Sequence, residues 1–170
     1  MSTIQEITES IIRENISRAV GDVFKTMLGR TCTLMAETKS PFSGASLQAG
    51  QCVVGTVGFI GELNGLIYLY FDTGFARLCA AQLLGMAEAE VDAAGDEVVN
   101  DAIGEITNMT VGSFKNSLCD AGYPCRLTIP SILRGTNFSV EPISSTTSYV
   151  FKFECTGHRL IADILIKAGE

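Results

Sequence analysis

Two long segments with helical periodicity restrict most strongly what this chain can fold into. In residues 3–28, apolar side chains recur at spacings of three and four, and Gly29 then ends the pattern. A second such segment covers about 95–119 and stops before Gly122. Each helix would present one apolar face, and that face must be buried against another layer of structure.

Segments rich in β-forming residues lie on both sides of the second long helix. Asn64-Gly65 is a strong hairpin signal, because both residues tolerate positive φ, and Thr156-Gly157 marks another tight reversal. We expect strands at 31–37, 51–60, 65–71, 125–130, 132–142, 146–156 and 158–168.

A shorter helix is predicted over about 74–85, between the two β-rich parts of the chain. Asp72 can cap its first turn, and Gly85 can end it. Residues 38–50 are polar and rich in Gly and Ser, which indicates a loop. The small and acidic residues 86–94 indicate a connector.

The order helix, strands, helix, helix, strands is typical of an α+β fold. We expect the two long helices and the shorter one to pack on a largely antiparallel β-sheet. With 170 residues, the chain is expected to form a single domain over 1–170.

Composition and charge exclude several classes of function. The net charge of −7 argues against nucleic acid as a partner, because phosphate binding requires clustered Lys and Arg. No segment reaches the roughly 18 consecutive apolar residues that a membrane span needs, so we expect no membrane insertion. Residues 1–13 lack the pattern of a secretory signal, which favours a cytoplasmic location.

The cysteines and the single histidine offer little support for a metal site. Six cysteines are present, none in a CxxC motif, and most lie in apolar stretches. We expect them to be small buried side chains in a reducing compartment. His158 has no Cys or acid at ligand spacing, so no metal is expected. A catalytic Cys–His pair stays open at this point.

The most informative segment is the helix predicted at 95–119. On a helical wheel at about 100° per residue, one side is apolar and forms the expected core stripe. The opposite side carries four residues that share one face. The apolar set is Val99, Ile103, Ile106, Thr110 and Phe114, and the opposite set is Asp101, Glu105, Asn108 and Gly112.

Glu105 and Asn108 are three residues apart, so a carboxylate and an amide would lie side by side on a rigid helix. Gly112 removes side-chain bulk from the same face one turn later, and Gly104 is a second glycine within the helix. Each glycine costs about 1 kcal/mol relative to Ala. Close approach of another surface and tight helix–sheet packing both explain such glycines. Acid and amide side chains on an exposed face most often only solvate it.

The run Asp101-Ala-Ile-Gly-Glu105-Ile-Thr-Asn108-Met-Thr-Val-Gly112 resembles the signature helix of the CheC/CheX/FliY phosphatases. That signature has an acid or Ser, three residues, Glu, two residues and Asn, followed about 22 residues later by Pro. Here Pro130 follows Asn108 after 21 intervening residues. The segments FKTMLG, ending at Gly29, and GTVGFIGELNGLIYLYF, beginning at Gly55, resemble the same family, which implies a CheC-like fold.

A single signature in the central helix is similar to CheX, whereas CheC-like members usually carry two. In the first helix Glu14 is followed by Ser17 and not by Asn. Glu97-x-x-Asn100 is a rival match in the central helix, but its distance to the downstream proline is wrong.

The resemblance implies hydrolysis of the aspartyl phosphate on a CheY-like response regulator. Asn108 would position the attacking water, and Glu105 would pair with the regulator's active-site lysine. Asp101 and Gly112 would support or contact the partner, and Pro130 would shape the backbone. The protein would need no cofactor of its own, because Mg²⁺ is expected in the regulator.

Two further expectations concern assembly and the alternatives to catalysis. CheX-like proteins are homodimers joined through their sheets, and 146–155 is an apolar candidate for an edge strand, so we expect a homodimer. The alternatives to a phosphatase are a non-catalytic module that binds a response regulator and a flagellar switch or assembly subunit. The Glu105/Asn108 pair favours catalysis.

Overall fold

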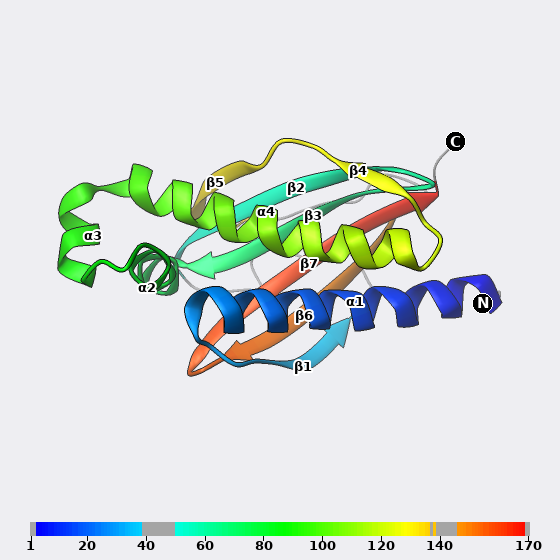
Figure 1. The fold of residues 1–170 in the computed structure, drawn as a ribbon, viewed down its shortest axis with the longest axis horizontal. Coiled ribbons are helices and arrows are strands. Elements are labelled where there is room, and N and C mark those ends of the chain that lie inside the picture. Colours follow the sequence, from blue (N-terminus) through cyan, green and yellow to red (C-terminus); the bar gives the residue numbers. More distant parts are fainter. Residues whose placement is uncertain (1–2, 39–49, 137, 139–145, 169–170) are drawn as a thin grey trace.

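The computed structural model describes residues 3–38, 50–136, 138 and 146–168, and these form one sheet with four helices (Figure 1). Most of the expected loop at 38–50 lies outside the described residues. The elements in order are α1 (Thr3–Leu28), β1 (Cys32–Thr38), β2 (Gln51–Gly61), β3 (Leu63–Asp72), α2 (Thr73–Leu84), α3 (Glu88–Ala94), α4 (Asp96–Asp120), β4 (Cys125–Leu127), β5 (Ser131–Thr136), β6 (Thr147–Cys155) and β7 (His158–Ala168).

The seven-stranded sheet has the order β1-β6-β7-β3-β2-β4, and β5 also pairs with β2. Every pairing is antiparallel. β4 and β5 follow one another along the same edge of β2, and between them the Gly58 N–H donates to Thr128 Oγ1 at 2.8 Å. The expected α+β class, with helices on an antiparallel sheet, is confirmed.

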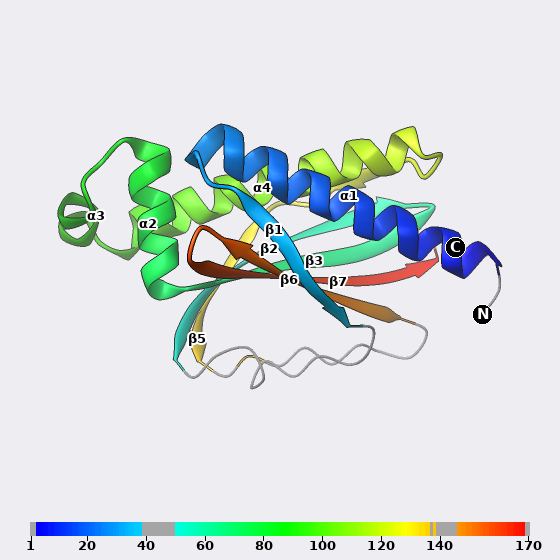
Figure 2. The same ribbon diagram turned by 90° about the horizontal axis from the view of Figure 1, so that it is seen from below.

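The two long helices lie side by side across one face of the sheet and bury their apolar faces against it (Figures 1 and 2). The shorter α2 begins with the predicted cap, in which the Phe75 N–H donates to the Asp72 carboxylate at 2.7 Å, and ends at Gly85 in the left-handed conformation. Rings from α1, β3 and α2 stack in the core, with Phe24 and Phe71 centroids 6.2 Å apart. The predicted helical periodicity therefore corresponds to the observed core.

The first predicted hairpin is present, but its turn is not at Asn64-Gly65. β2 ends at Gly61 and β3 begins at Leu63, so the reversal is centred on Glu62. The Asn64 side chain accepts a hydrogen bond from the Gly61 N–H at 3.0 Å. Gly65 lies within β3, where a β-carbon would collide with the Phe59 ring. The glycine is thus required by close packing and not by a positive φ.

The connector predicted at 86–94 is wrong, because most of it forms the short helix α3. Glu90 reaches back to accept from the Ala87 N–H at 3.2 Å, which satisfies one free donor of the first turn. Val91 is buried and holds the helix to the rest of the molecule. The small and acidic composition of this segment therefore concealed a helix whose buried side chain is Val91.

The strand at 146–155 is not an edge of the sheet. β6 pairs with β1 on one side and with β7 on the other, so neither of its edges is left unpaired. The edge argument for a homodimer therefore fails, although the dimer itself stays a prediction.

The expectation that the cysteines are unpaired is wrong for one pair. Cys32 of β1 and Cys155 of β6 face each other across neighbouring strands and form a disulfide. Cys79 is fully buried, and that burial raises the pKa of its thiol to about 12. The His158 ring stacks on Phe75 with centroids 4.8 Å apart. His158 is opposite Cys155 in the strand register, but the sulfur of Cys155 is in the disulfide.

The face of the sheet opposite the helices carries a buried carboxyl group, Asp163 of β7. The Ser148 hydroxyl donates to its Oδ1 at 3.0 Å, and Oδ2 accepts no hydrogen bond from the described residues. Burial raises the pKa of Asp163 to about 6 from 3.8, although the Ser148 hydrogen bond opposes this. Burial is the main cause of the raised pKa of Tyr68 and Tyr70, and the negative charge of Asp163 raises both further.

We therefore expect Asp163 to make the free energy of unfolding fall as the pH rises from about 4 to about 6. A raised folded-state pKa means that the native protein holds the proton more tightly, so this stability is complete below pH 3.8 and lost above pH 6. The loss amounts to about 3 kcal/mol. Urea unfolding of wild type and Asp163→Asn between pH 3.5 and 8 measures it. An identical pH dependence in both proteins would contradict the prediction.

Candidate functional site on helix α4

Helix α4 runs for 25 residues and is well defined at both ends. Asp96 and Glu97 lie in its first turn, where negative charge is favourable, and Gly122 takes a positive φ of 95° just beyond its end. The helix packs on β2 and lies between α1 and the β4–β5 edge (Figure 1). It is a rigid platform, and its orientation about its own axis decides which side chains reach the surface.

The predicted core stripe of α4 is buried. All five of its residues lie under the helix: Val99, Ile103, Ile106, Thr110 and Phe114. Phe114 packs against Phe59 of β2 with ring centroids 5.9 Å apart. The helix therefore faces the sheet with the side that its periodicity indicates.

A close contact between Thr107 and Gly55 fixes how deeply α4 sits on the sheet. Thr107 is fully buried, and its hydroxyl donates to the Ile103 carbonyl at 2.6 Å. A β-carbon on Gly55 of β2 would overlap that hydroxyl and lie 2.8 Å from the Thr107 Cβ. Sequence reasoning did not identify this pair, because neither residue is apolar enough to signal a core contact. Thr107 directly precedes Asn108, so the contact anchors the helix next to the signature amide.

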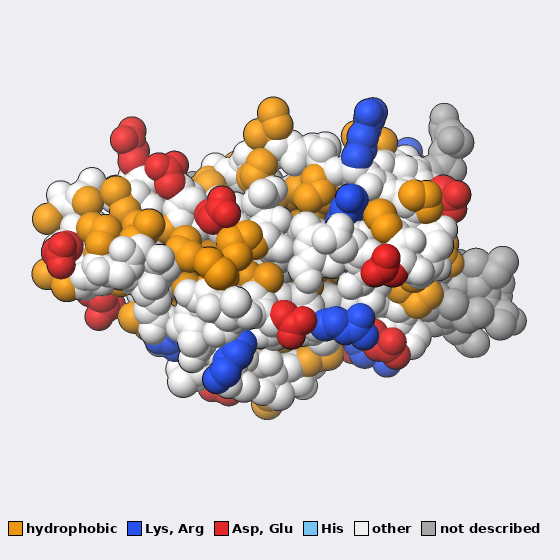
Figure 3. Space-filling view, viewed as in Figure 1, with side chains coloured by type: hydrophobic (Ala, Val, Ile, Leu, Met, Phe, Trp, Pro, Cys, Tyr) orange, Lys and Arg blue, Asp and Glu red, His pale blue; other side chains and the backbone are white. Residues whose placement is uncertain are grey.

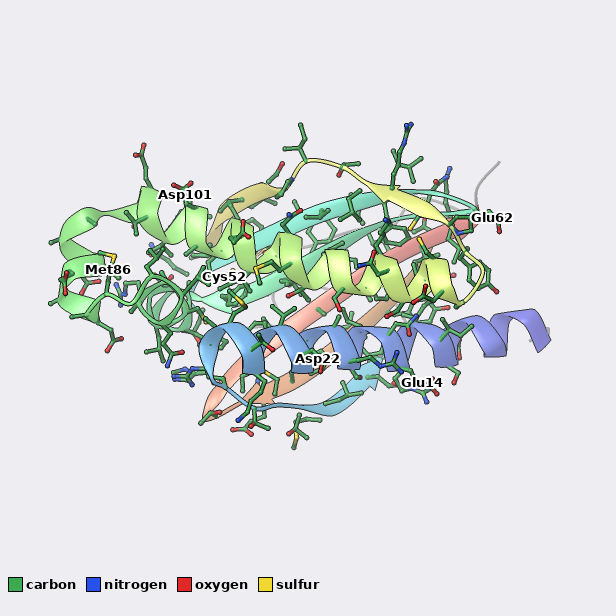
Figure 4. All side chains as sticks on the ribbon, in the orientation of Figure 1. Glu14, Asp22, Cys52, Glu62, Met86 and Asp101 are labelled. Atoms are coloured by element: carbon green, nitrogen blue, oxygen red, sulfur yellow. A yellow bond between two sulfur atoms is a disulfide. The ribbon has the colours of Figure 1, made fainter. Side chains whose placement is uncertain are left out.

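The four predicted site residues share the outward side of the helix. Glu105 and Asp101 are exposed, and Asn108 and Gly112 are half-buried. Asp101 projects from the outer part of α4 in Figure 4. The structure thus leaves an acid and an amide, one helical turn apart, on the surface of the molecule. A carboxylate there can accept from a cationic partner, and an amide can both donate to and accept from a water molecule.

The two glycines within α4 are not required by packing inside the molecule. A β-carbon on Gly112 would meet no atom within 4 Å, and one on Gly104 would make only an ordinary contact of 3.9 Å with Ile132. Each glycine nevertheless weakens the helix by about 1 kcal/mol relative to Ala. Of the two explanations that the sequence left open, tight helix–sheet packing is thereby excluded for Gly112.

Helix α1 presents a related face with a different polar group. Glu14 is exposed, and Ser17 and Gly21 are half-buried, so this face repeats the arrangement of Glu105, Asn108 and Gly112 on the neighbouring helix. Glu14 and Asp22 mark the outer side of α1 in Figure 4. The hydroxyl of Ser17 is shorter than an amide and offers one donor where an amide offers two.

Asn100, which belongs to the rival pair Glu97 and Asn100, has a structural role. The Asn100 Oδ1 accepts from the Arg134 Nε of β5 at 2.5 Å, and Arg134 also pairs with Asp96 at 3.5 Å. The Asn100 amide therefore joins α4 to β5 at the edge of the sheet. Asn108 takes no part in this interaction.

Pro130 lies in the short connection between β4 and β5, beside α4. Thr128 fastens this connection to Gly58 by hydrogen bonds in both directions, each 2.8 Å long. Pro130 is half-buried, whereas the preceding Ile129 is 87% exposed. A proline suits this position because the residue before a strand needs no N–H for the ladder.

A shallow apolar groove adjoins the signature residues and was not predicted. It lies between the end of α2 and the first half of α4, and Figure 3 shows apolar side chains gathered there beside acidic ones. Its lining residues are Leu83, Leu84, Val98, Asp101, Ala102 and Glu105. Leu83-Leu84 directly before the helix-ending Gly85 was the available signal, because successive residues are about 100° apart on a helix and the second leucine of such a pair can lie at the edge of the buried face.

The described residues contain no cluster of three or more His, Cys, Asp or Glu side chains arranged to hold a metal ion. Among them there is also no helix with the length and apolar character needed to cross a membrane.

Two comparisons with known protein sequences indicate the same family. The family model described as chemotaxis phosphatase CheX matches residues 53–154, which include the whole of α4. A Thermotoga maritima protein named CheY-P phosphatase CheX is 24% identical over 127 residues, covering 74% of this chain and 79% of that protein.

Solved structures share the fold over almost the whole chain. A CheC-like superfamily protein from Shewanella sp. PV-4 superposes with a TM-score of 0.78 at 22% identity, covering 93% of this chain and 98% of that one. A chain of the CheX–CheY–BeF₃–Mg²⁺ complex from Borrelia burgdorferi superposes with a TM-score of 0.67, also at 22% identity, covering 91% and 96%. At these identities the likeness establishes a common architecture.

The Gly55–Thr107 contact predicts a specific cost for adding one methyl group to β2. We expect Gly55→Ala to lower the free energy of unfolding by about 1–3 kcal/mol, because the new Cβ overlaps the buried Thr107 side chain. Thr107→Ala removes the overlapping hydroxyl and methyl but keeps the Cβ, so the double variant Gly55→Ala/Thr107→Ala should recover part of the loss when compared with wild type and both single variants. Urea denaturation of the four proteins gives the coupling energy. Additive effects of the two substitutions would show that the contact does not position the helix.

Proposed function

This chain belongs to the chemotaxis phosphatase CheX family, and we propose that it accelerates hydrolysis of the aspartyl phosphate on a CheY-like response regulator. The observation that carries the proposal is the outward position of Glu105 and Asn108 on a rigid, anchored helix. The Thermotoga maritima relative is named as a CheY-P phosphatase, and the Borrelia burgdorferi structure is a complex with CheY. Both support the same substrate class.

Asn108 is proposed to hold the attacking water. An aspartyl phosphate is cleaved when a water oxygen bonds to phosphorus and the bond from phosphorus to the aspartate oxygen breaks. The water's protons stay with the phosphate group or pass to solvent, and the aspartate leaves as a carboxylate. Such a transfer is accelerated mainly by positioning and charge stabilisation. A half-buried amide on a stiff helix meets that need, because it can bind a water without being displaced itself.

Glu105 is proposed to pair with the lysine in the regulator's active site. An exposed carboxylate one turn from Asn108 can reach such a cation when the two surfaces meet. Docking would remove most of the water from this pair, so its geometry would set the register of the complex. Asp101 extends the acidic face by one turn, and Gly112 leaves room for the regulator's backbone. Pro130 shapes the connection between β4 and β5 beside the helix.

The proposal assigns no metal or cofactor to this chain. The Mg²⁺ and the phosphorylated aspartate belong to the regulator, so this chain contributes two side chains and a surface. We place the reaction in the cytoplasm, where response regulators act, and expect the protein to work as a homodimer.

A regulator-binding module without catalysis is the alternative, and a flagellar switch or assembly subunit is a variant of it. Such a protein would need an exposed face but no particular amide at its centre. The retention of both Glu105 and Asn108 at the surface favours the catalytic function.

Asn108→Ala should abolish the stimulated loss of phosphate while leaving the fold and most of the binding intact. Loss of a water-positioning amide costs on the order of 10²-fold in rate. Decay of radiolabelled phospho-regulator measures this, and circular dichroism checks the fold. Asn116→Ala is the matched control, because it removes an exposed amide from the same helix, eight residues beyond Asn108 and outside the signature. Unchanged stimulation in Asn108→Ala would remove Asn108 from the mechanism.

Gly112→Ala should stabilise the protein and weaken its activity. The added methyl meets no atom of this chain, so the helix gains about 1 kcal/mol. The same methyl would obstruct the approach of the regulator and raise KM for phosphorylated regulator.

Gly21→Ala on α1 is the control for this substitution, since Gly21 is also half-buried and free of neighbours within 4 Å. It should raise Tm equally and leave KM unchanged. If both variants left KM unchanged, Gly112 would have no role toward the partner.

A further inference from the structure

We propose that the apolar groove between α2 and α4 receives an apolar side chain of the response regulator, flanked on the regulator by basic residues. The inference rests on the proposed function, because it assigns a second contact to the same partner. It concerns binding and not the chemistry, so it adds a determinant of affinity beside the catalytic pair.

The groove is continuous with the signature face. Asp101 and Glu105 line the groove and also belong to the outward side of α4 that carries Asn108. Along the helix, Ala102 lies about 9 Å from Asn108, at 1.5 Å per residue. A standard protein interface covers roughly 800 Å² on each partner, equivalent to a disc of about 16 Å radius. A regulator centred on Asn108 therefore covers the groove.

The groove offers an apolar surface that the fold itself does not need. Leu84 is 48% exposed at the end of α2, and Leu83 and Val98 are only partly buried beside it. Ala102 forms the floor, because its small side chain leaves the space open. Water on such a surface is released when an apolar side chain fills it, which is the main source of affinity in a protein interface.

The charges around the groove specify the partner further. Glu88 and Glu90 of α3 and Glu97 of α4 are exposed, in addition to the two acids that line the groove. Figure 3 shows acidic side chains around the apolar side chains on this part of the molecule. Two nearby arginines are already ion-paired within the chain, Arg77 with Asp92 and Arg134 with Asp96. The surroundings of the groove are thus acidic, and a complementary partner surface carries Lys or Arg around its apolar side chain.

Leu84→Ser tests the inference by separating KM from kcat. It should raise KM for the phosphorylated regulator about tenfold, as expected for truncating a central apolar contact, and leave kcat within twofold. Leu84→Met should bind like the wild type, since it keeps the apolar contact. Ile60→Ser is the matched control, because Ile60 is also 48% exposed and lies at the far end of β2. It should leave KM unchanged.

An unchanged KM in Leu84→Ser would overturn the inference even if the wild type proved to be a phosphatase. Direct binding of the BeF₃⁻-treated regulator with Mg²⁺, measured by calorimetry, separates this outcome from failure of the proposed function. If the wild type bound without speeding phosphate loss, a weaker binding of Leu84→Ser would still support the groove. If Leu84→Ser bound normally but dissociated a homodimer in light scattering, the groove would join two copies of this chain and the inference would be wrong.

Discussion

The contact between Thr107 of α4 and Gly55 of β2 sets the position of everything that we assign a function. Because Gly55 has no side chain, α4 packs close to the sheet, with the Thr107 side chain directly against Gly55. The apolar stripe on either side prevents the helix from turning about its axis. With depth and rotation both fixed, the opposite side of α4 carries Glu105 and Asn108 at the surface. Positioning of this kind is what phosphoryl transfer requires of a catalyst.

Much of this arrangement could be predicted because helical periodicity reports both faces of a helix together. The residues expected beneath α4 are buried, and Glu105 and Asp101 are exposed. The cap at Asp72 and the stop at Gly85 were also readable, since each depends on a local hydrogen bond or backbone angle. Periodicity could not assign the chemistry, which came from resemblance to a family.

The errors arose where a distant contact overrides a local signal. Gly65 pairs with Phe59 in the strand ladder and must be a glycine because a β-carbon would collide with the Phe59 ring, although Asn64-Gly65 indicates a turn. α3 depends on burial of Val91, and β6 is covered by β1 from the other end of the chain. The Cys32–Cys155 pair joins residues 123 positions apart, so no local pattern could reveal it. The groove beside α4 was missed for the same reason, since α2 and α4 contribute to it jointly.

We propose that this surface acts catalytically on a phosphorylated regulator and does not merely bind it. Phosphate release from a tenfold molar excess of phosphorylated CheY-like regulator, with Mg²⁺ present, tests this most directly. We expect each molecule of this protein to release many phosphates at a rate well above spontaneous decay. Decay at the spontaneous rate, or an effect limited to one regulator per molecule, would contradict it.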